Sequence, residues 1–350
     1  MAALAPPILP ETFKKICAFG LLFSGLISQA QYTDVINSNR PGKANSAYAV
    51  GKGVIQAEAG LFFEQQDHAI LNTESGIYGL DLALRYGLFF EALELHWEGI
   101  YQGQQITYLN LGTEERLSDF YRNRIGLKYL LYDRYKDPER NKPNLYSWRA
   151  NNVFQWSNLI PSVAVYAGAN FVLGDNPFYP QEPTVSPRVM VATQSRLTPR
   201  FVLITNIAYD RIGTDFPEWS YLVSLSHAFR NPKWSVFVEN QGIQSDRYSD
   251  VLLRSGVAYL ISPNFQADLH LGAGFKDTPS RIFVASGVSY RLDFHKDEVI
   301  PIEDQDAIGR NSMKKSGRKL SKSEKRSQRR AEKRNKKRQR AQGDPDGGGL

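Results

Sequence analysis

In several segments of residues 54–295, charged side chains of both signs stand at alternate positions among polar and small residues. In an extended chain this spacing places the charges on one side and the intervening apolar side chains on the other. Acids and bases gathered in this way form a paired network or line an aqueous path, because a buried charge needs a partner. We expect the following residues to face the interior of the fold: Glu58, Glu64, Asp81, Arg85, Glu94, Glu98, Arg122, Arg124, Lys128, Glu239, Arg254, Asp268, Arg291 and Asp293.

The five histidines form no catalytic or metal-binding pattern in the sequence. His270 has Asp268 two residues away on the same face but no serine partner, so a serine-hydrolase triad is not indicated. His96 and Glu98 place two ligand types on one face, and two ligands without a third do not make a metal site. The single cysteine excludes a disulfide framework and a four-cysteine zinc site. We therefore expect no enzyme, no bound metal and no other cofactor.

The elements that position the charges are strands, because alternation with a period of two dominates from Val54 onward. Residues 265–275 show it well, with apolar side chains at the odd positions and polar or small ones at the even positions. Twelve such segments follow one another, most of them about ten residues long, which is enough to cross a bilayer at a tilt. The mean hydropathy of −0.41 and the lack of long apolar runs exclude a bundle of transmembrane helices. The sequence predicts an all-β fold, a transmembrane antiparallel β-barrel of about twelve strands over residues 54–295.

The connections favour this barrel over a soluble β-sandwich, which alternates in the same way. Short turns, such as those at 197–199 and 262–264, alternate along the chain with longer polar loops. This pattern is typical of outer-membrane barrels, which have short periplasmic turns. An even strand number places both termini in the periplasm of a Gram-negative cell. We expect the long loops at 67–75, 102–119, 174–186, 211–218, 243–250 and 276–280.

Aromatic residues near the ends of the predicted strands fit an interfacial girdle in the outer-membrane lipid. The last segment, which ends at Phe294, resembles the closing strand of bacterial outer-membrane proteins, and this resemblance implies recognition by the barrel-assembly machinery. The girdle residues are Phe89, Phe201, Trp219, Tyr221, Trp234 and Phe265.

The N-terminal residues 1–30 have the layout of a secretory signal peptide. Lys14 and Lys15 precede an apolar stretch at 16–27, and Ser28 and Ala30 are the small residues before a cleavage site. The alternative is a buried helix that opens a cytosolic domain.

Residues 31–53 are polar, lack alternation and precede the first strand. We expect them to start in the periplasm and to fold into the barrel mouth as a short plug. Arg40 would then pair with an inward carboxylate such as Glu58 or Asp81, because a desolvated guanidinium needs a partner. The alternative is a flexible lead-in with Arg40 in solvent.

The formal charge of +7 divides unevenly along the chain. Residues 310–350 hold 16 Lys/Arg and 4 Asp/Glu, so the tail carries +12 and the preceding chain −5. We expect the segment 296–350 to be a disordered periplasmic tail, because it has too few apolar residues for a core. Its expected contacts are lipid phosphates, peptidoglycan or an acidic protein, not nucleic acid. A merely solvated extension is the alternative. The candidate anion-binding residues are Lys325, Arg326, Arg329, Arg330, Lys336, Lys337 and Arg338.

An aromatic-rich stretch at 145–160 lies inside the long connection 134–161. It could form a short amphipathic helix at the membrane surface, dock a partner, or tuck under the barrel mouth.

The segment 39–60 carries a distinctive set of residues. Arg40-Pro41, Ser46 and Lys52-Gly53 precede Gln56, Glu58 and Gly60 in the order Gln-x-Glu-x-Gly. This segment resembles the opening of the family named "putative MetA-pathway of phenol degradation", although Asn39 stands where that family commonly has Asp. The resemblance extends through Phe294 and implies an outer-membrane barrel with a passage for small molecules, apolar ones among them.

Together these patterns predict an outer-membrane channel or transporter for small molecules. We expect a mostly filled lumen with a restricted path, because charges of mixed sign tend to pair; an open, charge-lined path is the alternative. A different class of function remains open, a non-transporting accessory barrel that anchors a periplasmic or envelope assembly through its basic tail.

Overall fold

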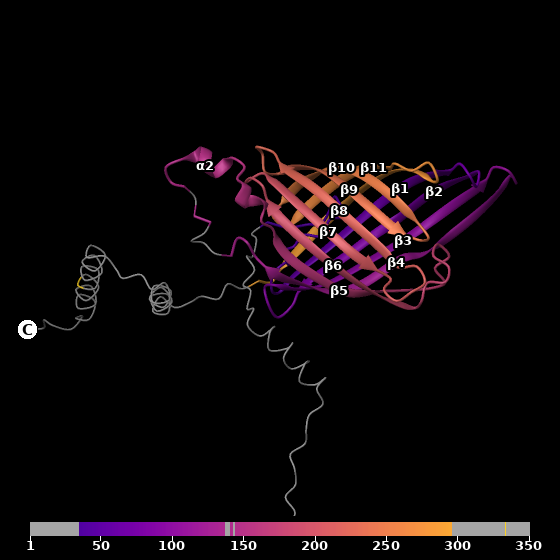
Figure 1. The fold of residues 1–350 in the computed structure, drawn as a ribbon, viewed down its shortest axis with the longest axis horizontal. Helices are drawn as coiled ribbons and strands as arrows, with labels where there is room; N and C mark the ends of the chain where they lie inside the picture. The colour runs from indigo at the N-terminus through magenta and orange to yellow at the C-terminus, as the bar shows by residue number, and fades with distance from the viewer. Residues whose placement is uncertain (1–34, 137–140, 143, 296–332, 334–350) are drawn as a thin grey trace, which may run out of the picture. The chain divides into compact units, whose positions relative to one another are not determined.

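A computed structural model describes residues 35–136, 141–142, 144–295 and 333. Twelve strands form one closed antiparallel barrel, as the alternation predicted (Figure 1). The predicted signal peptide and the predicted anion-binding residues of the tail lie outside the described residues. The strands are β1 (Val54–His68), β2 (Thr73–Gly87), β3 (Leu93–Tyr108), β4 (Thr113–Tyr132), β5 (Ser162–Phe171), β6 (Val185–Arg196), β7 (Phe201–Asp210), β8 (Glu218–Ala228), β9 (Trp234–Ser245), β10 (Ser249–Ser262), β11 (Phe265–Gly274) and β12 (Ser280–Asp293).

Each strand pairs with the next one along the chain, and β12 closes the barrel on β1. The closing register runs from Val54 opposite Asp293 to Asp67 opposite Ser280. Closure leaves no sheet edge with unpaired backbone groups, which is the condition for a sheet to stand in lipid. Because the strand number is even, β1 begins and β12 ends at the same end of the barrel.

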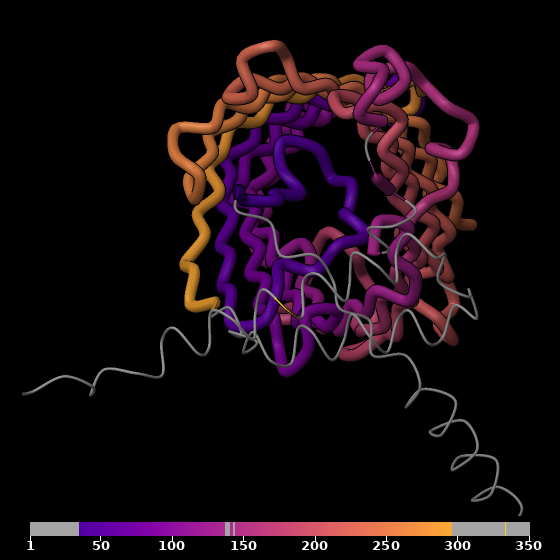
Figure 2. The backbone as a smooth tube through the Cα atoms, turned by 90° about the vertical axis from the view of Figure 1, so that its left-hand side faces the viewer, coloured from indigo at the N-terminus to yellow at the C-terminus, as the bar shows by residue number. Residues whose placement is uncertain are grey.

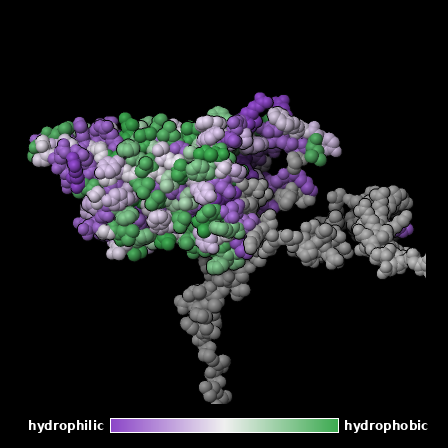
Figure 3. Space-filling model, turned by 180° about the vertical axis from the view of Figure 1, so that it is seen from behind, coloured by the Kyte–Doolittle hydropathy of each residue, from purple (hydrophilic) through white to green (hydrophobic). Residues whose placement is uncertain are grey.

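The outer face of the barrel is apolar because the strands alternate. In β11, Leu269 and Leu271 are 50% and 61% exposed, whereas the neighbouring Asp268 and His270 are buried inside. Green, hydrophobic atoms cover much of the barrel wall in Figure 3. Among the described residues no helix is long and apolar enough to span a bilayer.

The predicted long loop at 102–119 is wrong. Strands β3 and β4 continue through it as a hairpin, and only residues 109–112 connect them. The same holds at 67–75 and 243–250, where the connections shrink to 69–72 and 246–248. Polar side chains on both faces hid these strand ends, because a hairpin that extends beyond the membrane needs no apolar face. A long connection does remain between β5 and β6, at 172–184.

Residues 36–50, called the plug here, lie inside the barrel, where Figure 2 shows them as an indigo loop. None of these side chains is exposed. Ala47 and Tyr48 pack in a small apolar cluster with Ala92, Leu130 and Ala164 of the wall. The plug therefore fills part of the lumen from the end at which β1 begins.

The connection between β4 and β5 contains a short helix, α2 (Trp148–Asn152), and a 3₁₀ turn, η1 (Trp156–Leu159). The Ser147 hydroxyl caps α2 by accepting a hydrogen bond from the Ala150 N–H. Trp148 and Trp156 are 78% and 81% exposed, and the helix stands off the end of the barrel in Figure 1. The helix therefore does not tuck under the barrel mouth, whereas η1 contacts the end of β6 through a hydrogen bond from the Ser195 hydroxyl to the Leu159 carbonyl oxygen.

Candidate functional site

Arg40 fixes the plug to the barrel wall. Its guanidinium donates two hydrogen bonds of 3.0 Å to the carboxylate of Asp268 on β11, and it lies 3.7 Å from Asp81. Burial lowers the pKa of Arg40, but the hydrogen bond and charge of Asp268 outweigh this effect and raise it. The sequence prediction of pairing with Asp81 therefore holds at longer range, while the main partner is Asp268. Glu58 instead accepts a hydrogen bond from the Asn39 N–H.

Two glycines leave room for this guanidinium. Gly60 on β1 stands directly opposite Gly287 on β12. A Cβ atom at either position would overlap the guanidinium of Arg40. The glycine at the end of the Gln-x-Glu-x-Gly pattern is therefore required by a close approach of the plug rather than by a turn.

Further polar contacts hold the plug along its length. The Glu239 carboxylate accepts hydrogen bonds from the backbone N–H groups of Lys43 and Ala44, and from the Arg254 guanidinium. The Ser46 hydroxyl donates to Gln194 at 2.7 Å. These contacts reach β6, β9 and β10, so the plug bridges opposite sides of the wall.

A fully buried ion cluster lies at the end of the plug nearest β1. Arg85 donates two hydrogen bonds of 2.9 Å to Glu94, and Lys128 lies 3.1 Å from the same carboxylate. Lys128 also donates to the carbonyl oxygens of Ser46 and Tyr48 in the plug. The wall thus supplies charges that satisfy plug backbone groups, as buried polar groups require.

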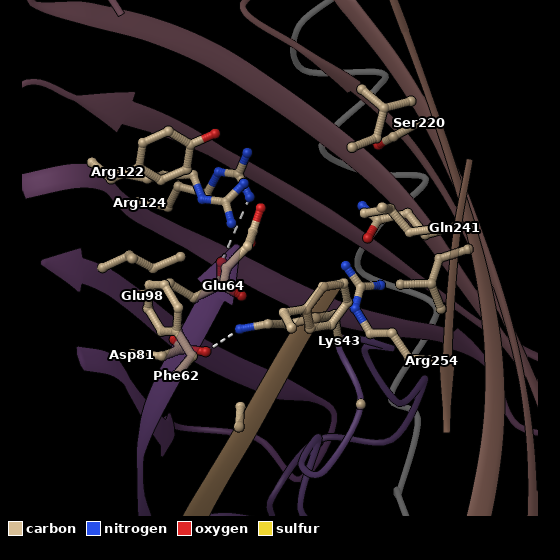
Figure 4. Close-up of a pocket in the computed structure, with 18 of the residues that line it drawn as sticks. Lys43, Phe62, Glu64, Asp81, Glu98, Arg122, Arg124, Ser220, Gln241 and Arg254 are labelled. Carbon is tan, nitrogen blue, oxygen red and sulfur yellow. Dashed lines mark hydrogen bonds and ion pairs between the residues drawn. The ribbon is translucent and has the colours of Figure 1, made fainter. Parts of the chain in front are cut away.

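Beyond the plug the lumen is open as a cavity of about 510 Å³. Figure 4 shows its polar lining, with Arg122 and Arg124 on one side and Gln241 and Arg254 on the other. Aromatic and aliphatic side chains from the strands complete the wall. The charged residues that line it are Arg40, Lys43, Arg122, Arg124, Arg188, Arg211, Arg247, Arg254 and Arg281, against Glu58, Glu64, Asp81, Glu98 and Glu218.

A second cavity of about 200 Å³ lies between the plug and strands β8–β11. Ile36, Pro41 and Phe237 line it. Arg40 borders both cavities. The plug therefore divides the space inside the barrel without filling it.

Most of the cavity cations have a carboxylate partner. Arg281 pairs with Glu64 at 2.6 Å, and Lys43 pairs with Asp81. Within the described part of the chain, Arg122 and Arg247 are the cavity cations with no carboxylate within 4.0 Å. Arg247 is exposed at the rim, whereas Arg122 lies deeper, on β4. The cavity wall therefore carries one inner guanidinium that no acid neutralises.

A β-bulge adds a side chain to the cavity next to Arg122. Ile100 pairs with Arg122 and Tyr101 pairs with Phe120, so Tyr121 is the extra residue on β4. Strict alternation from the inward Arg122 and Arg124 would place Tyr121 on the outer face, but the bulge lets Tyr121 and Arg122 both line the cavity.

The loop between β5 and β6 bends over the far end of the cavity. The Tyr179 ring lies between two guanidiniums, with Arg211 at 3.9 Å and Arg247 at 4.1 Å from its centroid. Arg211 also pairs with Glu182 of the same loop at 2.9 Å. These contacts hold the loop in a fixed position at the cavity rim.

The predicted site residues fall into three places. Arg40, Glu58, Asp81, Arg124 and Arg254 line the large cavity. Arg85, Glu94 and Asp268 contact the plug and lie outside the lining of the large cavity. Arg291 and Asp293 lie apart from both, at the end of β12, where Arg291 donates to Asn264. That Arg122 lacks a carboxylate partner could not be predicted from alternation, because alternation predicts the face of the strand on which a side chain lies and not its contacts.

The histidines take structural positions. The His270 ring packs edge-on against Phe237 and Phe283, and Asp268 is occupied by Arg40. His96 lies 3.4 Å from Glu98. Among the described residues no group of three His, Cys, Asp or Glu side chains could hold a metal ion.

A family model described as "Putative MetA-pathway of phenol degradation" matches residues 38–292, which confirms the resemblance seen in the sequence. A search of curated proteins found no match.

Among solved structures the chain is similar to the COG4313 outer membrane channel from Pseudomonas putida F1, with 10% identity and a TM-score of 0.48, covering 73% of this chain and 100% of that one. It is also similar to the CymD monoaromatic hydrocarbon channel, with 12% identity and a TM-score of 0.35, covering 71% of this chain and 90% of that one.

Proposed function

The chain belongs to the family described as "Putative MetA-pathway of phenol degradation", and from this premise we propose that it is a channel for small molecules rather than an enzyme. It is an outer-membrane β-barrel, with an apolar face toward lipid and a polar lumen. A narrow lumen with a fixed plug selects by size and by contact, as a substrate channel does, rather than passing bulk solution.

The observation that carries the proposal is the space left beside the plug. The cavity of about 510 Å³ on one side and the cavity of about 200 Å³ on the other share Arg40 as a border. A solute that moves between them passes Arg40 and enters the smaller cavity beside Phe237. A barrel built only as a structural anchor has no need for a wet, lined lumen.

We further propose that both ends of the barrel domain face the periplasm, and that the basic tail contacts anionic groups there. The long hairpin of β3 and β4 and the connection 172–184 at the opposite end support this orientation, because outer-membrane barrels extend toward the cell exterior; the connection 133–161 is the exception at the end where β1 begins. The tail's composition supports contact with phosphates or carboxylates, since 16 of residues 310–350 are Lys or Arg.

The experiment that tests the channel is solute uptake into proteoliposomes. Purified protein in liposomes should admit small solutes with volumes of up to a few hundred Å³ and exclude larger oligosaccharides, because the cavity volume sets the limit. Liposomes without protein give the background. Swelling rates no higher than that background would contradict the proposal.

One observation favours a second candidate, an accessory barrel that holds an envelope assembly. Trp148 and Trp156 are exposed on the connection between β4 and β5, at the end of the barrel where β12 ends, and exposed aromatic side chains are common in protein contacts. Replacing both with serine should release a co-purified partner if this candidate is right, and should leave solute uptake unchanged.

A further inference from the structure

Arg122 lies in the large cavity without an acidic partner. No carboxylate of the described residues comes within 4.0 Å of its guanidinium, and its Nε atom is buried with no hydrogen-bond partner. A guanidinium withdrawn from water without a counter-charge is costly, and an anion that enters from solution relieves that cost. The surroundings of Arg122 therefore favour an anionic ligand at this point of the lumen.

The neighbouring carboxylates are committed elsewhere. Asp210, whose side chain is fully buried, accepts from both Arg124 and Arg188. Glu98 lies 3.7 Å from Arg124 and 3.4 Å from His96. Figure 4 shows Arg122 and Arg124 side by side at the cavity wall. Because the acids are shared among these groups, this stretch of the wall presents a net positive charge to the cavity.

Apolar rings lie next to this charge. The Arg122 guanidinium stands 5.7 Å from the centroid of the Tyr121 ring, and the Tyr121 and Phe178 rings meet edge to face at 6.2 Å. All three side chains line the same cavity, and the bulge in β4 is what turns Tyr121 inward. A bulge that re-aims one side chain next to a charge is typical of a binding site.

We propose, on the basis of the channel function above, that the cavity binds small organic carboxylates, with the carboxylate on Arg122 and a flat apolar body against Tyr121 and Phe178. The planar fork of a guanidinium matches a carboxylate with two parallel hydrogen bonds. The cavity of about 510 Å³ is large enough for such a molecule. Arg122 is therefore a specificity-determining residue of the channel.

The test compares a carboxylate with its neutral isostere. Binding of benzoate and of benzamide to the purified full-length protein in detergent is measured by isothermal titration calorimetry. We expect benzoate to bind and benzamide to bind about tenfold more weakly, because a charge-assisted hydrogen bond is lost. Arg122→Gln should weaken benzoate binding about tenfold, and Arg122→Lys should weaken it less, because the charge stays and the fork is lost.

Arg116→Gln is the matched control, since Arg116 lies on the same strand with its side chain 77% exposed. Equal binding of benzoate and benzamide, or unchanged benzoate binding in Arg122→Gln, would overturn the inference. If Arg122→Gln does not fold, benzamide and Arg122→Lys decide in its place. Potassium chloride conductance of the same preparation tests the channel separately: conductance without benzoate discrimination overturns the ligand class alone, and its absence overturns the channel itself.

Discussion

The contacts of the plug and the inner wall of the large cavity differ at one position in how charge is paired. At the plug end, Arg40 is matched by Asp268, and Arg85 and Lys128 are matched by Glu94. In the cavity, Arg122 has no acid within 4.0 Å. Arginine therefore holds the plug to the wall where its charge is paired, as at Arg40, and is available to a ligand where it is not, as at Arg122.

The difference shows that charge pairing, rather than position on the inner face, separates structural from functional residues in this barrel. Paired groups cross-link the wall and the plug, and removing one member of a pair leaves the other charge buried without a partner. An unpaired group costs stability and is kept where a ligand supplies the missing charge. The following changes test this contrast, from the largest expected effect to the smallest.

Removing the ion pair between Arg40 and Asp268 should open the channel. In Arg40→Gln, Asp268 is left buried without its partner, at a cost of about 3 kcal/mol, or roughly a hundredfold in the docking equilibrium of the plug. We expect a higher conductance in planar bilayers. The double variant with Asp268→Asn should cost less than the sum of the two single ones, because both act on one pair. Unchanged conductance in Arg40→Gln would mean that the pair does not hold the plug.

Crowding the Arg40 guanidinium should raise the conductance in the same way but by less. Gly60→Ala places a methyl group against the Arg40 guanidinium and displaces it from Asp268, which should cost about 1–3 kcal/mol. Gly76→Ala on β2 is the matched control, because a Cβ there meets nothing within 4 Å. Conductance and thermal unfolding of the two variants are compared. If both behave alike, the slot between Gly60 and Gly287 is not needed.

Removing the unpaired charge should change selectivity and raise stability slightly, because a buried charge without a partner is lost. At about 8 Å in water a unit charge lowers the energy of a passing chloride ion and raises that of a potassium ion by about 0.5 kcal/mol each, or about fivefold in the chloride-to-potassium permeability ratio. Arg122→Gln should lower that ratio by this amount, read from the reversal potential in a salt gradient. Arg116→Gln should leave it unchanged. A similar drop in both variants would assign the selectivity to overall charge instead of to Arg122.

The sequence predicted the barrel and the side on which most charges lie, because the period of two is a property of any strand. Glu58, Asp81 and Arg124 face inward for this reason. The partner of Arg40 could not be predicted, since Asp268 is 228 residues away and its meeting with the plug depends on the closing of the barrel. The inward position of Tyr121 could not be predicted either, because a bulge shifts the alternation by one residue and no residue type marks that bulge.

The extent of the strands was also beyond the sequence. The hairpin of β3 and β4 runs through residues 102–119, where polar side chains lie on both faces. Alternation of hydropathy reports only the part of a strand that has one face in lipid or in a core. Outside that zone, backbone pairing with the neighbouring strand keeps the ladder, and the sequence pattern is silent.

The central claim, that solutes pass through the cavity beside the plug, is tested most directly by blocking that cavity. Ser220 lines it on β8 (Figure 4), and Ser118 is exposed on the extended part of β4. Each is changed to cysteine in a chain in which Cys17 is serine, and planar-bilayer conductance is recorded before and after a bulky thiol reagent. We expect Ser220→Cys to lose most of its conductance and Ser118→Cys to keep it. Full conductance in modified Ser220→Cys would contradict a path through this cavity.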